Sequence, residues 1–292
     1  MNIPKYENWF QHFSYTKLYR FPAWIFRKVL FLNVDFKKKV LIPMRIGHKI
    51  ELRATQPYLQ RILINQVYGD ESVFYLKQFL KKDAVIIDIG ANIGLLTCAY
   101  AQRYQHLSPT IYAIEAVEQN FLQLVKNLEL NNFHNVKPFR LALGKEKGEV
   151  IFNLPSKEFM GNAVGSNVLT DADEKKLGIA STYKEVVPLM TLDAWAAENK
   201  ISRCDFIKLD IEGAELAVFL GGQNFIKKFR PLIQCEFNRY YVEQQGLKIQ
   251  DYVTFFKTLQ YECYVDEKSH FRPIDVTQFH HTLVDLLFKP LS

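Results

Sequence analysis

The sequence is poor in cysteine, with four among 292 residues and no C-x-x-C pair. A structural zinc site needs closely spaced pairs of cysteine or histidine ligands, so this chain is not expected to hold one. The thiols stand instead in apolar stretches, where cysteine behaves as a small buried hydrophobe. We therefore expect reduced, buried side chains at Cys98, Cys204, Cys235 and Cys263.

The chain also lacks a long hydrophobic run. Its most apolar early segment, Phe21–Phe36, contains Arg27, Lys28 and Asp35 and is too short to span a bilayer. The first residues mix polar and aromatic types, with neither the apolar core nor the cleavage site of a signal peptide. These two features together predict a cytoplasmic protein.

A concentrated block of positive charge is missing too, although the formal net charge is +6. The lysines occur in short, scattered groups, whereas a nucleic-acid site gathers them on one face. A nucleic acid is therefore not the expected partner. The 292 residues can form one large domain, or one domain with an appendage, and hydrophobic residues make up 48%, which is ample for a buried core.

Residues 1–60 differ from the rest because they are rich in aromatic and basic side chains. We expect an N-terminal extension over residues 1–60, followed by a single enzyme domain over residues 61–292. The extension could cap a substrate or touch a membrane surface peripherally. Packing against the domain is the favoured alternative, since basic amphipathic stretches commonly serve that purpose.

Beyond residue 61, apolar runs alternate with helical patterns. This alternation predicts an α/β fold with a mostly parallel sheet covered by helices on both faces. The expected strands are 84–88, 110–115, 136–143, 150–154, 186–190, 205–210, 232–236, 262–265 and 283–288. The expected helices are 95–104, 117–130, a short one capped by Thr191, 213–220 and 251–259.

The segment Val85–Thr97, VIIDIGANIGLLT, is the most informative motif. Its glycines, Gly90 and Gly94, enclose Ala91-Asn92-Ile93, so the second glycine of the dinucleotide pattern G-x-G-x-x-G is missing. This difference argues against a nicotinamide cofactor. The turn suits a nucleoside with a compact charged tail, such as S-adenosylmethionine, whose carboxylate the helix N-terminus would attract.

Acidic residues end four of the five strands that should face the ligand, and Ala142 ends the fifth. Glu115 is placed to accept both ribose hydroxyls, although it could instead cap the next helix. Asp88 could meet the methionine ammonium or bond only to turn amides. The candidate cofactor-binding residues are Asp88, Gly90, Ala91, Asn92, Gly94, Glu115 and Ala142.

In a second motif, DFIKLDIEGAE, charged residues alternate along an expected strand. Lys208, Asp210 and Glu212 would share one face, either serving a substrate or forming a structural ion pair. Asp210 is the expected general base, with Glu236 as its partner. These acids and Asn238 could also bind Mg²⁺, but no spacing requires a metal and none is expected. The candidate catalytic residues are Asp210, Glu236 and Lys208.

Together, these segments resemble the FkbM-type methyltransferases that use S-adenosylmethionine. The matching pieces are VIIDIGANIGLLT, AIEAVEQN, LALG, VPLMTLDAW, DFIKLDIEGAE and PLIQCE, in that order over about residues 84–240. The resemblance implies a class I methyltransferase fold and O-methylation of a sugar, polysaccharide or secondary metabolite. Ala116-Val117 departs from the usual proline after the acid, which changes a turn only.

Two other functions stay open at this point. The same fold could methylate RNA or protein, although no N-P-P-[YF] segment is present to hold an exocyclic amine. It could also be a binding module without catalysis, since a fold alone never proves activity. Gly161–Asn167, GNAVGSN, is either a lid or an ordinary surface loop. The oligomeric state and the acceptor are not determined by the sequence.

Overall fold

The computed structural model describes residues 39–53, 62, 66, 68, 70–155, 181–267 and 270–291. The compact unit that contains them runs from Lys39 to Ser292. The expected lid at Gly161–Asn167 lies outside the described residues, as do residues 1–38 and 54–60 of the expected extension.

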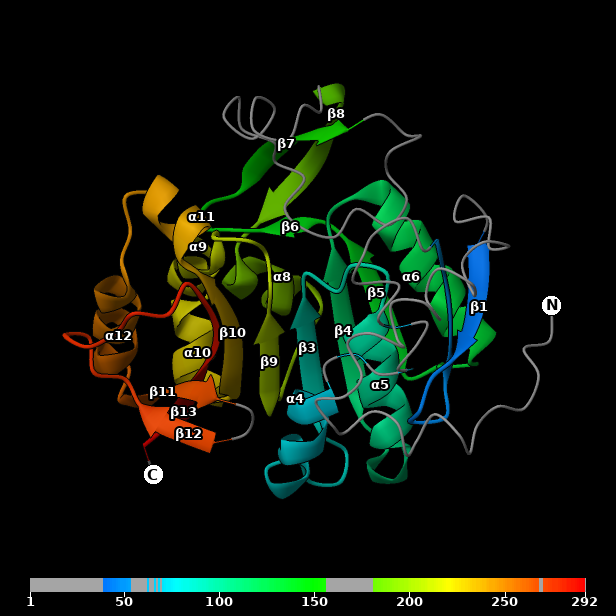
Figure 1. Ribbon diagram of the computed structural model, residues 1–292, viewed down its shortest axis with the longest axis horizontal. Coiled ribbons are helices and arrows are strands. Elements are labelled where there is room, and N and C mark those ends of the chain that lie inside the picture. Colours follow the sequence, from blue (N-terminus) through cyan, green and yellow to red (C-terminus); the bar gives the residue numbers. More distant parts are fainter. Residues whose placement is uncertain are drawn as a thin grey trace, which may run out of the picture. The chain divides into compact units, whose positions relative to one another are not determined.

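An eight-stranded sheet forms the centre of this unit (Figure 1). Four neighbouring pairs, from β5 to β10, are parallel, while β13 is antiparallel to both of its neighbours. This arrangement confirms the predicted α/β, mostly parallel architecture. The order across the sheet is β12 (His270–Pro273), β11 (Tyr261–Glu267), β13 (Leu283–Pro290), β10 (Leu232–Asn238), β9 (Phe206–Leu209), β3 (Val85–Ile89), β4 (Thr110–Glu115) and β5 (Val136–Arg140).

Helices cover both faces of the sheet. Tyr112 of β4 packs edge-on against Trp195 of α8 (Leu192–Glu198), with ring centroids 5.6 Å apart. Phe206 of β9 packs against Tyr100 of α5 (Leu95–Arg103). Across the sheet, Phe206 pairs with Ile86 of β3, whereas Tyr112 pairs with the next residue, Ile87. Since successive strand residues point to opposite faces, α8 and α5 lie on opposite sides.

The remaining helices follow the strands along the chain. They are α4 (Asp70–Tyr75), α6 (Glu118–Leu130), α9 (Glu215–Gly221), α10 (Gln223–Phe229), α11 (Arg239–Gln244) and α12 (Ile249–Thr258), with short 3₁₀ turns at Leu76–Gln78 and Gln105–Leu107. The predicted cap of α8 is confirmed, because the Thr191 hydroxyl accepts the Ala194 N–H at 3.1 Å.

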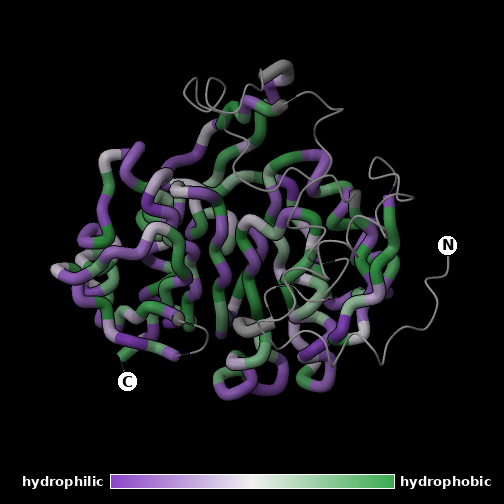
Figure 2. The backbone as a smooth tube through the Cα atoms, viewed as in Figure 1, coloured by the Kyte–Doolittle hydropathy of each residue, from purple (hydrophilic) through white to green (hydrophobic). Residues whose placement is uncertain are grey.

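The core is built from strands that are apolar on both faces, as buried parallel strands require. All four residues of β9 are buried, and so are Ile86, Ile87 and Ile89 of β3. Figure 2 shows hydrophobic stretches along the central strands and hydrophilic residues on many outer loops. The four cysteines are free and buried, as expected from their apolar surroundings.

One predicted strand is wrong. The expected strand 136–143 is divided, since β5 ends at Arg140 and β6 (Ala142–Leu143) joins a separate three-stranded sheet. There β6 pairs with β8 (Ser181–Met190), which also pairs with β7 (Gly148–Pro155). An apolar run does not reveal that the chain changes partner strands halfway, because both halves are extended.

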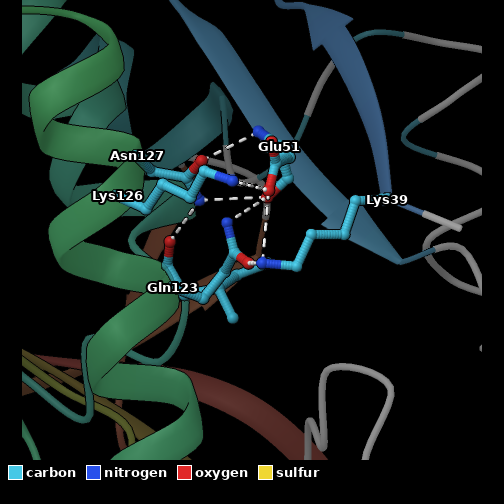
Figure 3. Close-up of polar contacts among 6 residues, drawn as sticks. Lys39, Glu51, Gln123, Lys126 and Asn127 are labelled. Carbon is cyan, nitrogen blue, oxygen red and sulfur yellow. Dashed lines mark hydrogen bonds and ion pairs between the residues drawn. The ribbon is translucent and has the colours of Figure 1, made fainter.

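A hairpin of β1 (Lys39–Pro43) and β2 (Lys49–Arg53) packs beside α6. Its inward side chains Ile42, Ile50 and Leu52 are buried. Several polar contacts meet at Glu51 of β2 (Figure 3). Its carboxylate lies 2.7 Å from Lys126 Nζ of α6 and 3.2 Å from Lys39 Nζ of β1. The hairpin therefore belongs to the same compact unit as the sheet, although it lies within residues 1–60.

None of the described helices is long and apolar enough to cross a bilayer.

Candidate active site

The strand order reverses beside β3. The chain passes from β3 to β4 and β5 on one side, then places β9 and β10 on the other. In open α/β sheets, ligands bind at such a reversal, beyond the carboxyl ends of the strands. The loops that follow β3 and β9 meet there, and they contain the two motifs singled out in the sequence.

Gly90 brings these two loops into contact. It has a left-handed φ of +81°, and a Cβ built on it would lie 2.0 Å from the backbone oxygen of Asp210. The Asp210 N–H in turn donates to the Ile89 oxygen at 3.0 Å. Only glycine fits at this position, since both the conformation and the close approach exclude a side chain.

The backbone amides of the turn after β3 are already hydrogen-bonded within the protein. Gly90 and Ala91 both donate to the Ile114 oxygen, at 2.9 and 3.0 Å, and Gly94 donates to the Ala91 oxygen at 2.9 Å. Asn92 N–H donates to Glu115, and the Asn92 side chain accepts the Ile93 N–H at 2.8 Å. The turn is thus preformed, and a ligand carboxylate here needs donors other than these five amides.

Asp88 lies beneath this turn rather than on its surface, with 2% of its area exposed. Its carboxylate accepts the Thr97 hydroxyl from α5, and burial raises the pKa of Asp88 to about 6. The alternative role expected bonds to turn amides, whereas the bond that the structure shows comes from the Thr97 side chain of α5.

Glu115 ends β4 and joins the turn to the start of α6. Its Oε2 accepts the Asn92 N–H at 2.8 Å, and its Oε1 accepts the Val117 N–H at 3.0 Å. Burial raises the pKa of Glu115 to about 7, although these two backbone bonds oppose the shift. Glu115 thus contacts the N-cap residue of α6, Val117, which was the alternative to a ribose contact, and its buried carboxylate stands at the carboxyl end of β4 beside the turn.

Lys208 is a buried cation shared between two acids. Its Nζ lies 3.1 Å from Asp285 Oδ1 on β13 and 3.9 Å from Asp210 Oδ2. Burial alone would lower the pKa of Lys208, but Asp285 and then Asp210 raise it well above its usual value. The ion pairs that the structure shows join Lys208 to Asp285 and Asp210, whereas the sequence suggested Glu212 as its partner and did not reveal Asp285.

Three carboxylates converge next to Lys208. Oxygens of Asp210, Glu212 and Glu236 all lie within 4.8 Å of one another, close enough to raise one another's pKa or to surround a divalent cation. Burial and then the neighbouring Asp210 raise the pKa of Glu236 to about 8. Burial also raises the pKa of Asp210, and Lys208 opposes this shift. Asp210 and Glu236 are therefore stronger bases in their ionised forms than exposed carboxylates.

Glu212 reaches this group by a route that differs from the prediction. The strand β9 ends at Leu209, and Glu212 has a left-handed φ of +59°. Strand alternation therefore stops before Glu212, and a tight turn brings its side chain back beside Asp210.

Glu215 is a functional candidate that the sequence reasoning missed. Its buried Oε1 accepts the N–H groups of Ile211 and Gly213, both at 3.1 Å, and so holds the turn that contains Glu212. Its Oε2 lies 3.4 Å from the Tyr252 hydroxyl of α12. A glutamate at the first turn of a helix, two residues after the glycine of DIEGAE, was the available signal.

Ala142 was chosen as the end of a central strand, and that reason is wrong. It lies in β6, opposite Leu189 of β8 in the small sheet. Its contact with a cofactor stays a prediction without that support.

One family model matches more than half of this chain. Residues 88–264 match the model of the methyltransferase FkbM domain. Methyltransferase 1 of Beauveria bassiana is 27% identical over 148 residues, covering 48% of this chain and 58% of its own length. Methyltransferase sdnD of Sordaria araneosa is 29% identical over 161 residues, covering 49% of this chain and 61% of its own length.

The chain therefore spans about three-fifths of the length of these two curated relatives. Among solved structures, a similar one is methyltransferase FkbM from Methylobacillus flagellatus KT, at 17% identity and a TM-score of 0.45. That match covers 75% of this chain and 47% of the other.

Proposed function

The chain belongs to the FkbM methyltransferase family, and we propose that it transfers a methyl group from S-adenosylmethionine to a hydroxyl of a sugar, polysaccharide or secondary metabolite. The observation that carries this proposal is the contact between Gly90 and the Asp210 backbone at the strand reversal. It sets the glycine turn beside the cluster of acids, as transfer from a nucleoside cofactor to a neighbouring acceptor requires.

Family membership makes S-adenosylmethionine the cofactor of this domain. The residues fit it, because Glu115 presents a carboxylate at the end of β4, where the acid of related nucleotide-binding folds accepts ribose hydroxyls. The missing middle glycine of the turn agrees with a ligand that has no pyrophosphate. Glu115 would hold the ribose, while Gly90 and Gly94 keep the turn tight.

The bound cofactor supplies an electrophilic methyl group on a sulfonium. A hydroxyl acceptor must then lose its proton, and we assign that proton to the pair of Asp210 and Glu236. Their raised pKa values make their ionised forms stronger bases than a surface carboxylate. Lys208 stabilises the ionised form of Asp210 from the buried side.

A small-molecule acceptor agrees with the family, and the preference for a hydroxyl follows from this cluster of carboxylates. The prediction of no resident metal is kept, since Lys208 already offsets part of the negative charge. The cytoplasmic location and the division at residue 60 also stay predictions.

Mass spectrometry tests the proposal directly. The purified chain is incubated with S-adenosylmethionine and a carbohydrate and metabolite extract, and products heavier by one methylene increment are sought. We expect such a product with the unsubstituted chain, and a loss of about 100-fold or more in Asp210→Asn. Full activity in that variant would remove Asp210 from the mechanism, and an absent product would contradict the proposed reaction.

A further inference from the structure

In the part of the chain that the structure describes, side chains of α6, and no further strand, bond the edge of β2 that faces away from β1. Gln123, Asn127 and Asn131 recur every four residues and so share one face of the helix. Asn131 Oδ1 accepts the Lys49 N–H and its Nδ2 donates to the Lys49 oxygen, both at 2.7 Å. The three amides therefore satisfy backbone groups that an edge strand would otherwise expose.

Asn127 makes the same kind of contact one step along the strand. Its Oδ1 accepts the Glu51 N–H at 2.8 Å, and its Nδ2 donates to the Glu51 oxygen at 3.2 Å (Figure 3). Gln123 adds a bond to that same oxygen at 2.9 Å. Up to this point, Asn127 and Asn131 are equivalent.

The two asparagines differ in their third contact. Asn127 Nδ2 also donates to the Ile93 oxygen at 2.8 Å, whereas Asn131 Nδ2 donates to the Asn127 oxygen within its own helix. Ile93 lies in the glycine turn after β3, between Asn92 and Gly94. Asn127 is fully buried, with 0% of its area exposed, so water does not replace this bond.

The helix also touches the turn at Gly94. A Cβ built there would lie 2.6 Å from Leu124 Cδ1, which shows how closely α6 approaches. On the other side of Ile93, the Asn92 N–H donates to Glu115. A shift of the Ile93 peptide therefore moves the residues that the proposed function places against the cofactor.

We propose that Asn127 is a positioning residue for S-adenosylmethionine, because its amide fastens the β1–β2 hairpin to the Ile93 peptide of the cofactor turn. This inference rests on the proposed function, in which that turn and Glu115 contact the cofactor. It assigns to the hairpin, which lies before the matched family domain, a share in cofactor affinity.

Calorimetric titration of the full chain with S-adenosylmethionine tests the inference without any acceptor. Asn127→Ala and Asn131→Ala each remove hydrogen bonds to β2, but only Asn127→Ala removes the bond to Ile93. We expect the Kd to rise about tenfold in Asn127→Ala and less than about threefold in Asn131→Ala, with both proteins folded by circular dichroism. Equal Kd values in the two variants would overturn the inference.

A second pair covers the case in which the alanine variants do not fold. Asn127→Asp and Asn131→Asp keep the side-chain shape and the acceptor for the strand N–H, but lose the donated bonds. The same difference in Kd is expected between them, and its absence counts against the inference.

Glu115→Gln separates this inference from the proposed function. If Glu115→Gln weakens binding while both asparagine pairs bind equally, only the role of Asn127 fails. If the unsubstituted chain binds no S-adenosylmethionine, both proposals fail.

Discussion

Lys208 Nζ lies 0.8 Å closer to Asp285 than to Asp210, at 3.1 Å against 3.9 Å. The buried cation is thus drawn toward β13 and away from the acid assigned as the base. Asp285 also faces Glu236 across the β10–β13 pair, so it adds negative charge beside both members of that pair. Asp285 accordingly raises the pKa of Asp210 and of Glu236.

Asp285→Asn should lower the pKa values of the two catalytic carboxylates, Asp210 and Glu236. Removing this charge lowers the pKa of Asp210 and Glu236, because Lys208 can then neutralise Asp210 more fully. The base form is present above its pKa, so the rise of methyl-transfer rate with pH should move by about one unit toward lower pH. Rates measured from pH 5 to 9 check this. Glu262→Gln on β11 is the control, and an identical shift in it would contradict a local effect.

Gly90→Ala should destabilise the fold and abolish cofactor binding. The new methyl group would meet the Asp210 oxygen at 2.0 Å in a left-handed conformation, which only backbone movement relieves. We expect a loss of roughly 1–3 kcal/mol in the free energy of unfolding, measured with urea. Gly148→Ala is the matched control, since nothing lies within 4 Å of its Cβ position. Equal stability of the two variants would show that the Gly90 contact is not tight.

Glu115→Gln should weaken S-adenosylmethionine binding by tenfold or more, because it removes the charge from the hydrogen bonds to ribose. Glu185→Gln provides the comparison. Glu185 also accepts a backbone N–H at the start of α6, from Glu118 at 2.9 Å, but it does so from β8. Calorimetry should show near-normal affinity in Glu185→Gln. Similar weakening in both variants would mean that Glu115 acts as a helix cap only.

Glu215→Gln should slow catalysis more than it weakens binding. Its carboxylate holds the turn after Asp210, and a displacement of a catalytic group by about 1 Å can cost 100-fold in rate. We expect kcat to fall about 10- to 100-fold, with the Kd for S-adenosylmethionine within about threefold of the unsubstituted chain. Asp193→Asn is the control, because Asp193 likewise accepts two backbone N–H groups, from Asn224 and Phe225. A kcat that falls as far in the control would indicate a general effect of stability.

Chelation should leave methyl transfer unchanged. The ammonium of Lys208 lies 3.9 Å from Asp210 and offsets part of the charge of the close carboxylates of Asp210, Glu212 and Glu236 without a metal. Activity is compared with EDTA, with EDTA followed by excess Mg²⁺, and without addition. Loss with EDTA that Mg²⁺ restores would identify these three acids as metal ligands.

Much of the central fold could be predicted from the sequence, since its strands are local apolar runs with clear ends. The strand at Thr110–Glu115 was predicted with its observed bounds, and the cap at Thr191 was correct. Leu141 marks where prediction failed, because the change from one sheet to another depends on which strand is nearby. Such pairing over long sequence distances leaves no local pattern.

In the candidate site, too, residues within local motifs could be predicted, whereas contacts between distant segments could not. Gly90 and Asp210 were found from their motifs, and the structure brings them together. Asp285 was missed because only the register of β13 against β10 places it beside Lys208. Asn127 could not be predicted although Gln123, Asn127 and Asn131 have regular helical spacing, because such a polar row is also typical of a solvated helix face. The role of the loop at Gly161–Asn167 stays a prediction.

The hairpin of β1 and β2 has a practical consequence for truncation. A shortened chain that begins at residue 61, or at the first residue of the family match, would remove the backbone partners of three α6 amides and uncover the apolar surface that packs against Ile50 and Leu52. It would also remove the hydrogen bonds between the Asn127 side chain and Glu51 of β2, and leave the one to the Ile93 oxygen. The minimal fragment suited to biochemical work therefore starts no later than Lys39.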